Sequence, residues 1–519
     1  MKSNKGLFYS SLFISLFLLL PFYFLFFKGI EGHANEWEHI SKNLLSQYVL
    51  NTFYILLSVG ALCLIWGVFP AYLLSRFRFF GSNFFKWALV GPLAIPTFIM
   101  AIVYSGLTDI SGPLASLSRF LFDSPHLLRI DILNFWGLSL TLSFALYPYV
   151  YLSSLIAFTN RTRSFEEAAK SLGAKNNSIF FRITLPLALP FVLSGLLLVL
   201  METLNNYGAM KYYGYNTLTV GLFKAWFDLN DLTSAVYIGG ILFVFALIML
   251  LIRQGTHFKG EKENSSSTNR QKLSGIKNAL ATLFCTLLFG FAFIAPCLFI
   301  ITKGIKKFGQ VVDGEFFLTV VNTIVICSCS AILIVFISLY FSSSKRWLKS
   351  TLLRNLFEMN NTGYAIPGAI IAIGIVAFAQ LATIHSGLLF WSFILMCFGF
   401  VIRFLSSGFQ TIDNALKNKS IAQDESAMSL GARSWGVFKN IHLPQLKLPI
   451  IIAFSIVFIE IIKELPLTLI LKPFNFESLS TLTFQYAKDE MLEMACVPAM
   501  FILIITIVPN FLIQKALND

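Results

Sequence analysis

Long apolar stretches alternate with short polar ones along the whole chain. A helix needs about 20 apolar residues to cross the hydrocarbon core of a bilayer, and twelve stretches of roughly that length can be marked. They are residues 7–27, 48–74, 86–107, 134–158, 187–204 and 234–253, followed by 278–302, 316–341, 364–384, 387–407, 449–471 and 491–514. The pattern predicts an all-α integral membrane protein with about twelve transmembrane helices.

A charged, serine-rich segment separates the first six stretches from the last six. It reads RQGTHFKGEKENSSSTNRQKLSG at residues 253–275, a composition that is too polar to enter lipid and typical of a flexible linker. We therefore expect two tandem six-helix halves, residues 1–254 and 277–519, joined by a linker at 255–276.

The first apolar stretch has two features of a cleaved signal peptide. Lys2 and Lys5 precede it, and Gly-His-Ala at 32–34 weakly matches a cleavage site. Its apolar core of about 20 residues is too long for a typical signal sequence. We expect a retained membrane anchor.

Composition and charge support membrane insertion and give an orientation. Hydrophobic residues make up 56% of the chain and charged residues 13%, with a mean hydropathy of +0.74, values far from those of a soluble domain. Lys and Arg gather in loops that fall on one side of the predicted spans, which is the cytoplasmic side by the positive-inside rule. These residues are Lys2, Lys5, Arg76, Arg78, Lys86, Arg161, Arg163, Lys170, Lys175, Arg182, Lys345, Arg346, Lys349, Arg354, Lys417, Lys419, Arg433 and Lys439, together with the basic linker. Both termini and the linker are predicted to be cytoplasmic, and the net charge of +13 requires no nucleic acid partner.

The seven cysteines all lie within or at the ends of apolar stretches. Only Cys327 and Cys329 are close in sequence, and a spacing of two places them on different faces of a helix. We interpret the cysteines as small hydrophobic residues. His33, His39 and His126 fall in loops on the other side of the membrane, where solvation is the simpler interpretation, and the sequence leaves any metal ligand unknown.

One short polar sequence motif occurs twice, 258 residues apart. Residues 166–174 read EEAAKSLGA, residues 424–432 read DESAMSLGA, and an Ile-x-Leu-Pro sequence follows each at the same distance, at 183–186 and 441–444. The first part favours a helix, the Gly permits the positive φ that ends one, and Pro is favoured where the next begins. The pattern predicts a short helix pair outside the membrane. One copy could be an ordinary connector, but two copies in register indicate a shared role.

This pattern resembles the EAA loop of the permease subunits of binding-protein-dependent ABC importers. The matching residues are Glu167, Ala168, Ala169, Gly173, Ile183, Leu185 and Pro186 in the first copy, and Glu425, Ser426, Ala427, Gly431, Ile441, Leu443 and Pro444 in the second, where Ser426 is the one departure. Glu166 and Asp424, which precede them, belong to the same candidate surface. The resemblance implies that each loop couples this chain to one of two cytoplasmic ATPase subunits, which would bind ATP and Mg²⁺. No cofactor is expected on this chain itself.

Two further segments narrow the resemblance. METLNNYGAMKYYGYNTLTVGLFKAW at 201–226 and IEIIKELPLTLILKPFNFESLSTLTFQYAKDE at 459–490 are similar to segments of the fused, two-half permeases of ferric iron importers. That similarity implies import of ferric iron across the bacterial inner membrane, delivered by a periplasmic binding protein. Similar fused permeases import thiamine or aminophosphonates, so these substrates stay as alternatives.

Five residues in these segments are candidates for the transport pathway. They are Glu202, Tyr207, Glu460, Lys463 and Glu464. Ionisable groups within membrane spans are functional candidates by default. The competing interpretations are that the acids and the lysine at 460–464 neutralise one another at a helix end, that Glu202 is a pseudo-symmetric structural contact, and that Tyr207 belongs to an interfacial aromatic belt.

The sequence lacks the motifs of an enzyme. It contains no G-x-x-x-x-G-K-[ST] phosphate loop, no H-E-x-x-H and no G-x-S-x-G, so we expect a transport subunit whose energy comes from a partner. An ion-coupled secondary transporter is the main alternative class. Such a carrier should repeat its membrane-buried polar groups most closely, whereas here the closest internal repeat lies in the polar loops.

The predicted orientation can be tested by labelling. In a variant without the native cysteines, a single cysteine at position 176 or 264 should react with a membrane-impermeant thiol reagent only after the cells are opened. Labelling of either position in intact cells from the periplasmic side would rule this orientation out.

Overall fold

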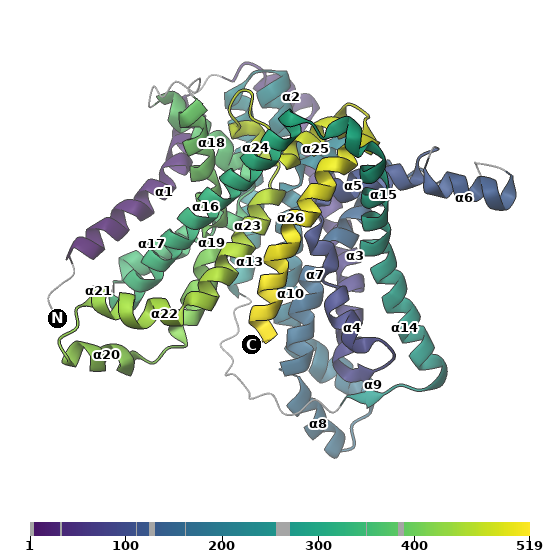
Figure 1. The fold of residues 1–519 in the computed structure, drawn as a ribbon, viewed down its shortest axis with the longest axis horizontal. Coiled ribbons are helices and arrows are strands. Elements are labelled where there is room, and N and C mark those ends of the chain that lie inside the picture. The colour runs from purple at the N-terminus through teal and green to yellow at the C-terminus, as the bar shows by residue number, and fades with distance from the viewer. Residues whose placement is uncertain are drawn as a thin grey trace.

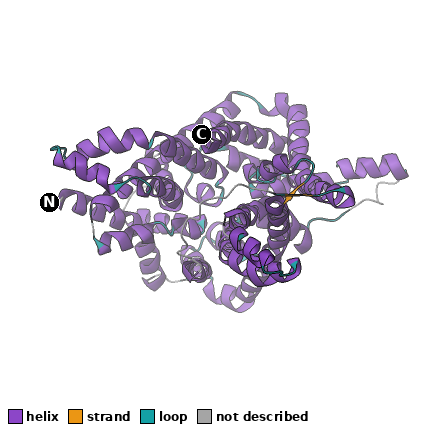
Figure 2. Cartoon of the chain, turned by 90° about the horizontal axis from the view of Figure 1, so that it is seen from below, coloured by secondary structure: helices purple, strands orange, loops and turns teal. Residues whose placement is uncertain are grey.

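The structure is a computed structural model, and it describes residues 5–31, 34–110, 112–123, 130–160, 162–255, 270–348, 350–381 and 389–518. The centre of the predicted linker, 256–269, lies outside the described residues. So do Lys2, His33, His126, Arg161 and Lys349. Figure 2 shows that the described chain is almost entirely helical, with one small pair of strands.

Each of the twelve predicted spans corresponds to one or more helices. In the first half these are α1 (Lys5–Glu31), α3 (Leu45–Arg76), α5 (Thr97–Thr108), α7 (Phe135–Asn160), α10 (Leu185–Asn205) and α13 (Leu232–Gly255). In the second half they are α14 (Gly275–Phe289) continued by α15 (Ala295–Val311), α16 (Gly314–Trp347), α18 (Gly368–Leu381), α19 (Leu389–Lys417), α23 (Lys447–Lys463) and α26 (Leu492–Asn518). Within the described ranges, nine helices are long and apolar enough to cross a membrane, or up to eleven if each of two bent pairs is one span.

Shorter elements connect these helices or lie at their ends. The short α-helices are α2 (Trp37–Asn43), α4 (Ser82–Ala88), α6 (Pro113–Phe122), α8 (Arg163–Ser171), α9 (Asn176–Ile179), α11 (Tyr207–Tyr212), α12 (Leu218–Phe223), α17 (Thr351–Asn360), α20 (Ile421–Ser429), α21 (Ser434–Val437), α22 (Leu443–Gln445), α24 (Pro466–Leu471) and α25 (Leu479–Lys488). The 3₁₀-helices are η1 (Gly91–Ala94) and η5 (Gly363–Ala365), and the π-helical turns are η2 (Phe180–Thr184), η3 (Lys224–Asp228), η4 (Gly290–Ile294) and η6 (Phe438–His442). The strands are β1 (Phe77–Arg78) and β2 (Gln271–Lys272).

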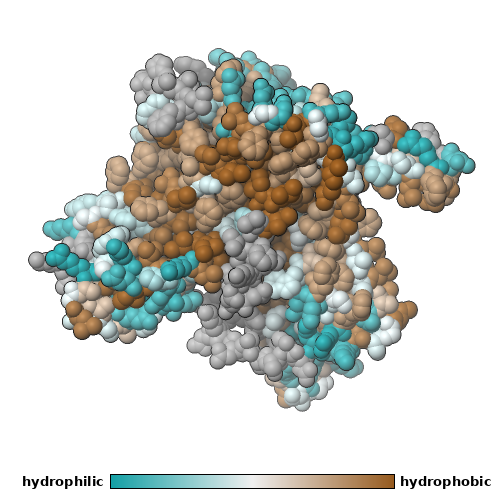
Figure 3. Space-filling model, in the orientation of Figure 1, coloured by the Kyte–Doolittle hydropathy of each residue, from teal (hydrophilic) through white to brown (hydrophobic). Residues whose placement is uncertain are grey.

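The long helices run side by side (Figure 1). In Figure 3, hydrophobic side chains cover the middle of the visible face and hydrophilic ones gather toward its two ends. Large exposed side chains on these helices, such as Phe13, Phe69 and Phe336, are therefore placed to contact lipid. This distribution is that of a multi-pass membrane protein.

The third span of each half is interrupted at the same three residues, Ala-Ile-Pro. In the first half, α4 and η1 lead to Ala94-Ile95-Pro96 and α5 follows; in the second, α17 and η5 lead to Ala365-Ile366-Pro367 and α18 follows. In the second half the chain bends by 115° between the two limbs. Proline lacks the N–H that continues a helix and disfavours helical geometry in the residue before it. The predicted span 86–107 therefore contains a break that the sequence analysis did not predict, and the predicted span 364–384 begins at one.

The predicted fifth span of the second half, 449–471, is also interrupted. α23 ends at Lys463, and α24 begins at Pro466 after an extended Glu464. In the first half the corresponding helix, α10, ends at Asn205, and α11 begins at Tyr207. Both fifth helices thus stop part-way through the molecule and are followed by a short helix.

The first helix of each half packs on the other half. α1 contacts α17 and α18, and α14 contacts α3 and α4. Ser11 donates a hydrogen bond to Ser344 (2.9 Å), and the Phe80 N–H donates to the Asn278 side chain (2.9 Å). The two halves are therefore interlocked in space, and the division at 1–254 and 277–519 stays a prediction about the sequence.

The end of the predicted linker is held against the first half. β2 pairs in parallel with β1, with Phe77 opposite Gln271, and the Arg270 guanidinium donates to Asn83 (2.8 Å). We predicted a flexible segment through residue 276, so these residues correct that prediction. A strand pair satisfies backbone groups that a flexible linker would leave to water.

The cysteines lie in several environments. Cys63, Cys285, Cys327, Cys397 and Cys496 are buried, Cys297 is half-buried and Cys329 is exposed. Within the described ranges, no three His, Cys, Asp or Glu side chains lie together as a metal site would require.

Candidate functional site

The two repeated loops have the same backbone course. α8 and α20 end at Ser171 and Ser429, and each is followed by a C-cap Leu and then a glycine with positive φ, +80° at Gly173 and +86° at Gly431. In each loop the N–H of the residue after the glycine bonds back to a carbonyl five residues earlier, from Ala174 to Ala169 and from Ala432 to Ala427. These bonds close the helix end in the way a left-handed glycine allows. The predicted sequence of helix, glycine and second helix is confirmed in both copies.

The acid that anchors the first loop is Glu166. Its side chain is buried and forms an ion pair with Arg76, the last residue of α3. The hydroxyls of Thr162 (3.0 Å) and Thr184 (2.6 Å) also donate to it. The neighbouring Glu167, which matches the family pattern, is exposed.

The second loop repeats this arrangement with different residues. Asp424 is buried and accepts a hydrogen bond from the Arg346 Nε (2.6 Å), and its other oxygen lies 2.9 Å from the His442 Nε2. Arg346 belongs to the last turn of α16 and also donates to the backbone carbonyls of Leu416 and Lys419. Each loop is thus pinned to the second long helix of its own half.

In both loops, the partner that follows the acid in the sequence stands at the same position of the repeat. Thr184 and His442 are the variable residues of the two Ile-x-Leu-Pro sequences, and each stands 18 residues after its acid. Loss of one partner of a buried ion pair strongly destabilises the folded protein, because the other charge stays buried without compensation. The geometry therefore assigns Glu166 and Asp424 to holding the loop, and leaves Glu167 and Glu425 facing outward.

The other predicted loop residues include both buried and exposed side chains. Ala169 is buried against the loop, Ala168 is exposed and Ala427 is half-buried. Pro186 and Pro444 are exposed and stand at the second position of α10 and α22. The leucines before the glycines, Leu172 and Leu430, are 87% and 90% exposed. Figure 1 shows α8 and α20 at the same end of the molecule and well apart.

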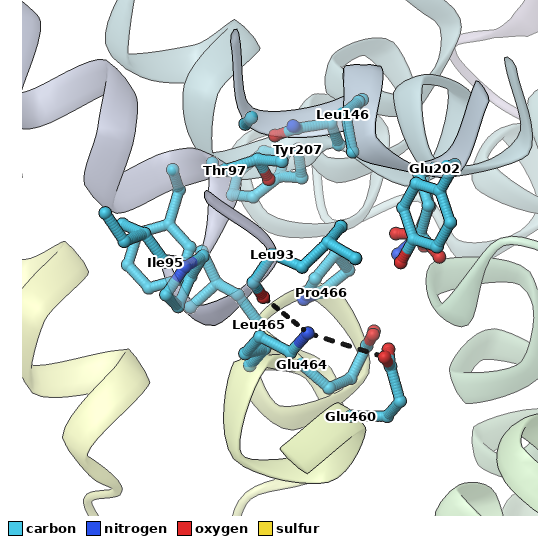
Figure 4. A pocket seen from close by; sticks show the side chains of 18 of the residues that line it. Leu93, Ile95, Thr97, Leu146, Glu202, Tyr207, Glu460, Glu464, Leu465 and Pro466 are labelled. Atoms are coloured by element: carbon cyan, nitrogen blue, oxygen red, sulfur yellow. Dashed lines mark hydrogen bonds and ion pairs between the residues drawn. The ribbon is translucent and has the colours of Figure 1, made fainter. Parts of the chain in front are cut away.

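A small cavity lies between the break in the third span of the first half and the ends of the fifth helices of both halves. Its volume is ≈ 60 Å³, and Figure 4 shows side chains from both halves pointing into it. All five predicted pathway residues line this one cavity: Glu202, Tyr207, Glu460, Lys463 and Glu464. Residues 258 positions apart in the sequence, such as Glu202 and Glu460, therefore meet in space.

Lys463 spans the cavity wall between the halves. Its amino group donates to the Leu93 carbonyl (3.2 Å) and to Glu460 (3.4 Å), contacts drawn as dashed lines in Figure 4. The alternative in which the charges at 460–464 neutralise one another is thus correct for Glu460 and Lys463. Glu464 has a different partner.

That partner is Arg403, which the sequence analysis missed. Arg403 is 1% exposed, its Nε donates to Glu464 (2.9 Å), and its Nη1 donates to the Ile366 carbonyl (2.8 Å). The signal was present, because an arginine in the predicted apolar span 387–407 is an ionisable group in lipid and requires a partner. Three carboxylates and two cations line the cavity, so one carboxylate is in excess.

Comparison with known families decides the class of the protein. The family described as "Binding-protein-dependent transport system inner membrane component" matches residues 63–259 and again 334–517. The chain belongs to this family. It is a permease of the ABC importer class and a multi-pass protein of the inner membrane, and the two matches place one copy of the family's domain in each half.

Individual relatives of this permease differ in the substrate that their names give. It is 25% identical to the Fe(3+)-transport system permease protein FbpB 2 of Haemophilus influenzae, over 97% of this chain and 96% of the relative. It is 29% identical to the molybdenum transport system permease protein ModB of the same species, over 38% of this chain and 86% of the relative. It is 26% identical to the sulfate transport system permease protein CysT of Escherichia coli, over 40% of this chain and 73% of the relative.

The division between anchoring and outward-facing acids in this permease gives a test. Asp424→Ala should leave Arg346 without its carboxylate and lower the free energy of unfolding by about 3 kcal/mol. Glu425→Ala removes an exposed carboxylate one residue away and should change it by about 0.5 kcal/mol or less. Thermal unfolding of the purified full chain in detergent measures the difference. Equal melting temperatures for the two variants would contradict the assignment.

Proposed function

We propose that this chain is the permease subunit of an ATP-driven importer that takes up ferric iron delivered by a periplasmic binding protein. Two cytoplasmic ATPase subunits would dock on the chain, one at each repeated loop. The loops, the linker and both termini would then lie on the cytoplasmic side, as the distribution of Lys and Arg favours. ATP and Mg²⁺ would be held by the partner ATPases, since this chain has no phosphate loop.

The observation that carries the ATPase proposal is the matched exposure of Leu172 and Leu430. Among the described side chains of each loop, this leucine is the most exposed large apolar one, and burial of a leucine contributes about 1.5–3 kcal/mol. A partner surface with two equivalent clefts would bury both. A simple connector between spans needs neither the exposed leucine nor its repetition at an equivalent position.

The anchored acids explain how docking could drive transport. Because Glu166 is paired with Arg76 and Asp424 with Arg346, each loop moves together with the long helix that carries the arginine. Closure of the two ATPases on ATP would bring the loops toward each other, and the halves would rock around the central cavity. Glu202, Tyr207, Glu460, Lys463 and Glu464 would line the pathway that opens to alternate sides.

The iron assignment draws its support from the relative named for Fe(3+) transport, which this chain matches along nearly its whole length. The relatives named for molybdenum and sulfate match only one half-length segment each. Import of an oxyanion is therefore the second candidate. No observation favours thiamine or an aminophosphonate.

The docking proposal predicts a conformational effect at the two glycines. A Cβ at Gly173 or Gly431 meets no atom within 4 Å, so substitution acts through the positive φ alone. Val at either position should cost about 1–2 kcal/mol and weaken ATPase association about fivefold to thirtyfold, with uptake lost and membrane abundance unchanged. Co-purification of the ATPase with the tagged permease measures this effect.

Gly309→Val is a matched control, because Gly309 also has open space and does not have a positive φ. It lies in α15, outside both loops. A double Gly173→Val, Gly431→Val variant that binds ATPase and transports at the wild-type rate would show that the loops are ordinary connectors.

The substrate proposal predicts the phenotype of a deletion strain. In cells without other ferric uptake systems, loss of this permease should abolish high-affinity uptake of radiolabelled iron, and the cloned gene should restore it. Unchanged iron uptake together with lost molybdate, sulfate, thiamine or phosphonate uptake would transfer the assignment to that substrate.

A further inference from the structure

A second, larger cavity lies next to the central one, on the side away from the repeated loops. Its volume is ≈ 320 Å³, and Tyr207 lines both cavities. α11, α12 and η3 of the first half form one wall, and α24 and α25 of the second half form the other. Figure 1 shows α24 and α25 at the end of the molecule opposite α8 and α20. We call this cavity the outer vestibule.

Four lysines, two from each half, line the outer vestibule. They are Lys211, Lys224, Lys472 and Lys488, and the one acid among the lining residues is Asp228. Lys472 is also paired with Glu477, which lies outside the lining. Four positive charges against two negative ones leave the vestibule positive.

Two of these lysines, Lys211 and Lys488, are available to bind a ligand. The other two already have partners, since Lys224 donates to the Asn216 side chain (2.9 Å) and Lys472 pairs with Glu477. For Lys211, which is half-buried, and Lys488, which is exposed, the described part of the chain supplies no ion-pair partner. They belong to different halves, so a ligand held between them would bridge the two sides of the pathway.

The walls of the outer vestibule strengthen this field and add a neutral donor. The Tyr207 and Phe223 rings stack at 3.7 Å between centroids, and Phe484 lies 5.7 Å from Tyr207. Apolar walls around charges of one sign focus the electrostatic potential inside a cleft. Gln485 also lines the cavity, and its exposed side-chain amide can donate a hydrogen bond to an oxygen ligand.

We propose that the outer vestibule binds the substrate as an oxygen-rich anion, held by Lys211 and Lys488. The inference rests on the proposed import function and specifies its substrate class. A bare ferric cation would be repelled by the lysines, whereas a free tetrahedral oxyanion and a ferric ion enclosed by anionic oxygen ligands share the chemistry that the site recognises. From this site the substrate would pass Tyr207 to the central cavity.

Calorimetric titration of the purified full chain tests the site directly. The probes are sodium molybdate, sodium sulfate and ferric citrate, each in low-salt buffer. At least one should bind, and the double variant Lys211→Gln, Lys488→Gln should bind it at least tenfold more weakly. Binding of molybdate or sulfate identifies a free oxyanion as the ligand, and binding of ferric citrate alone identifies the metal complex.

Two further variants control for folding and for general surface charge. Lys211→Arg with Lys488→Arg keeps the charges and should retain most of the affinity. Lys306→Gln removes an exposed lysine of α15 outside the vestibule and should bind like the wild type. If no probe binds the wild type, or if the Gln double variant binds as tightly as the wild type, the inference is overturned.

Uptake separates this inference from the iron proposal. If cells with the wild-type chain import no iron while the purified chain binds an oxyanion through the two lysines, the iron proposal fails and the vestibule stands. If iron uptake is normal in both the wild type and the Gln double variant, the iron proposal stands and the vestibule inference fails.

Discussion

The centre of this permease depends on side chains that satisfy backbone groups freed by two broken helices. Inside a bilayer, water is not available to bond an unpaired carbonyl or N–H, and such a group costs several kcal/mol. Here Lys463 bonds the Leu93 carbonyl, Arg403 bonds the Ile366 carbonyl, and Asn205 accepts from the Gly368 N–H (2.8 Å). The Lys463 and Asn205 contacts join the two halves. The break that lines the cavity, at Leu93 to Pro96, is thus stabilised from the other half by Lys463.

In each half, a helical segment connects this centre to a repeated loop. α10 begins immediately after Thr184, which bonds the anchoring Glu166, and it ends at Asn205, which bonds Gly368. Its 21 residues extend over about 30 Å. In the second half the path runs from His442 through a 72° bend to Lys463 at the end of α23. A displacement of either loop is thus applied to a residue that holds the cavity together.

The sequence was informative where the signal was local. Apolar length located the spans, and the segments after the two fifth spans supplied five pathway candidates, all of which line one cavity. Hydropathy did not reveal the breaks at Pro96 and Pro367, because proline within an apolar run hardly changes an average over the span. The packing of α1 and α14 on the opposite halves depends on contacts between residues far apart in the chain, which no local pattern encodes.

The separate role of Glu166 and Asp424 in anchoring the loops was not predicted, because all four acids were placed on one candidate surface. Matching Glu167 and Glu425 to a motif compares letters and does not consider which face of the helix each residue occupies. Glu166 and Asp424 lie on the buried face, and a partner 18 residues later in both copies was the available clue. Arg403 was visible as a charge in an apolar span, but its partner could be chosen only once Glu464 was known to leave the helix.

Fusion of the two halves into one chain has a consequence for how the pathway can evolve. When two identical subunits form a pathway on their two-fold axis, every side chain beside the axis appears twice, and a single lysine there would face its own copy. In this chain, Lys463 has Asn205 as its counterpart, Glu464 has Asn206, and His442 has Thr184. A substitution in one half is not mirrored in the other, so the charge of the cavity can change by one unit at a time.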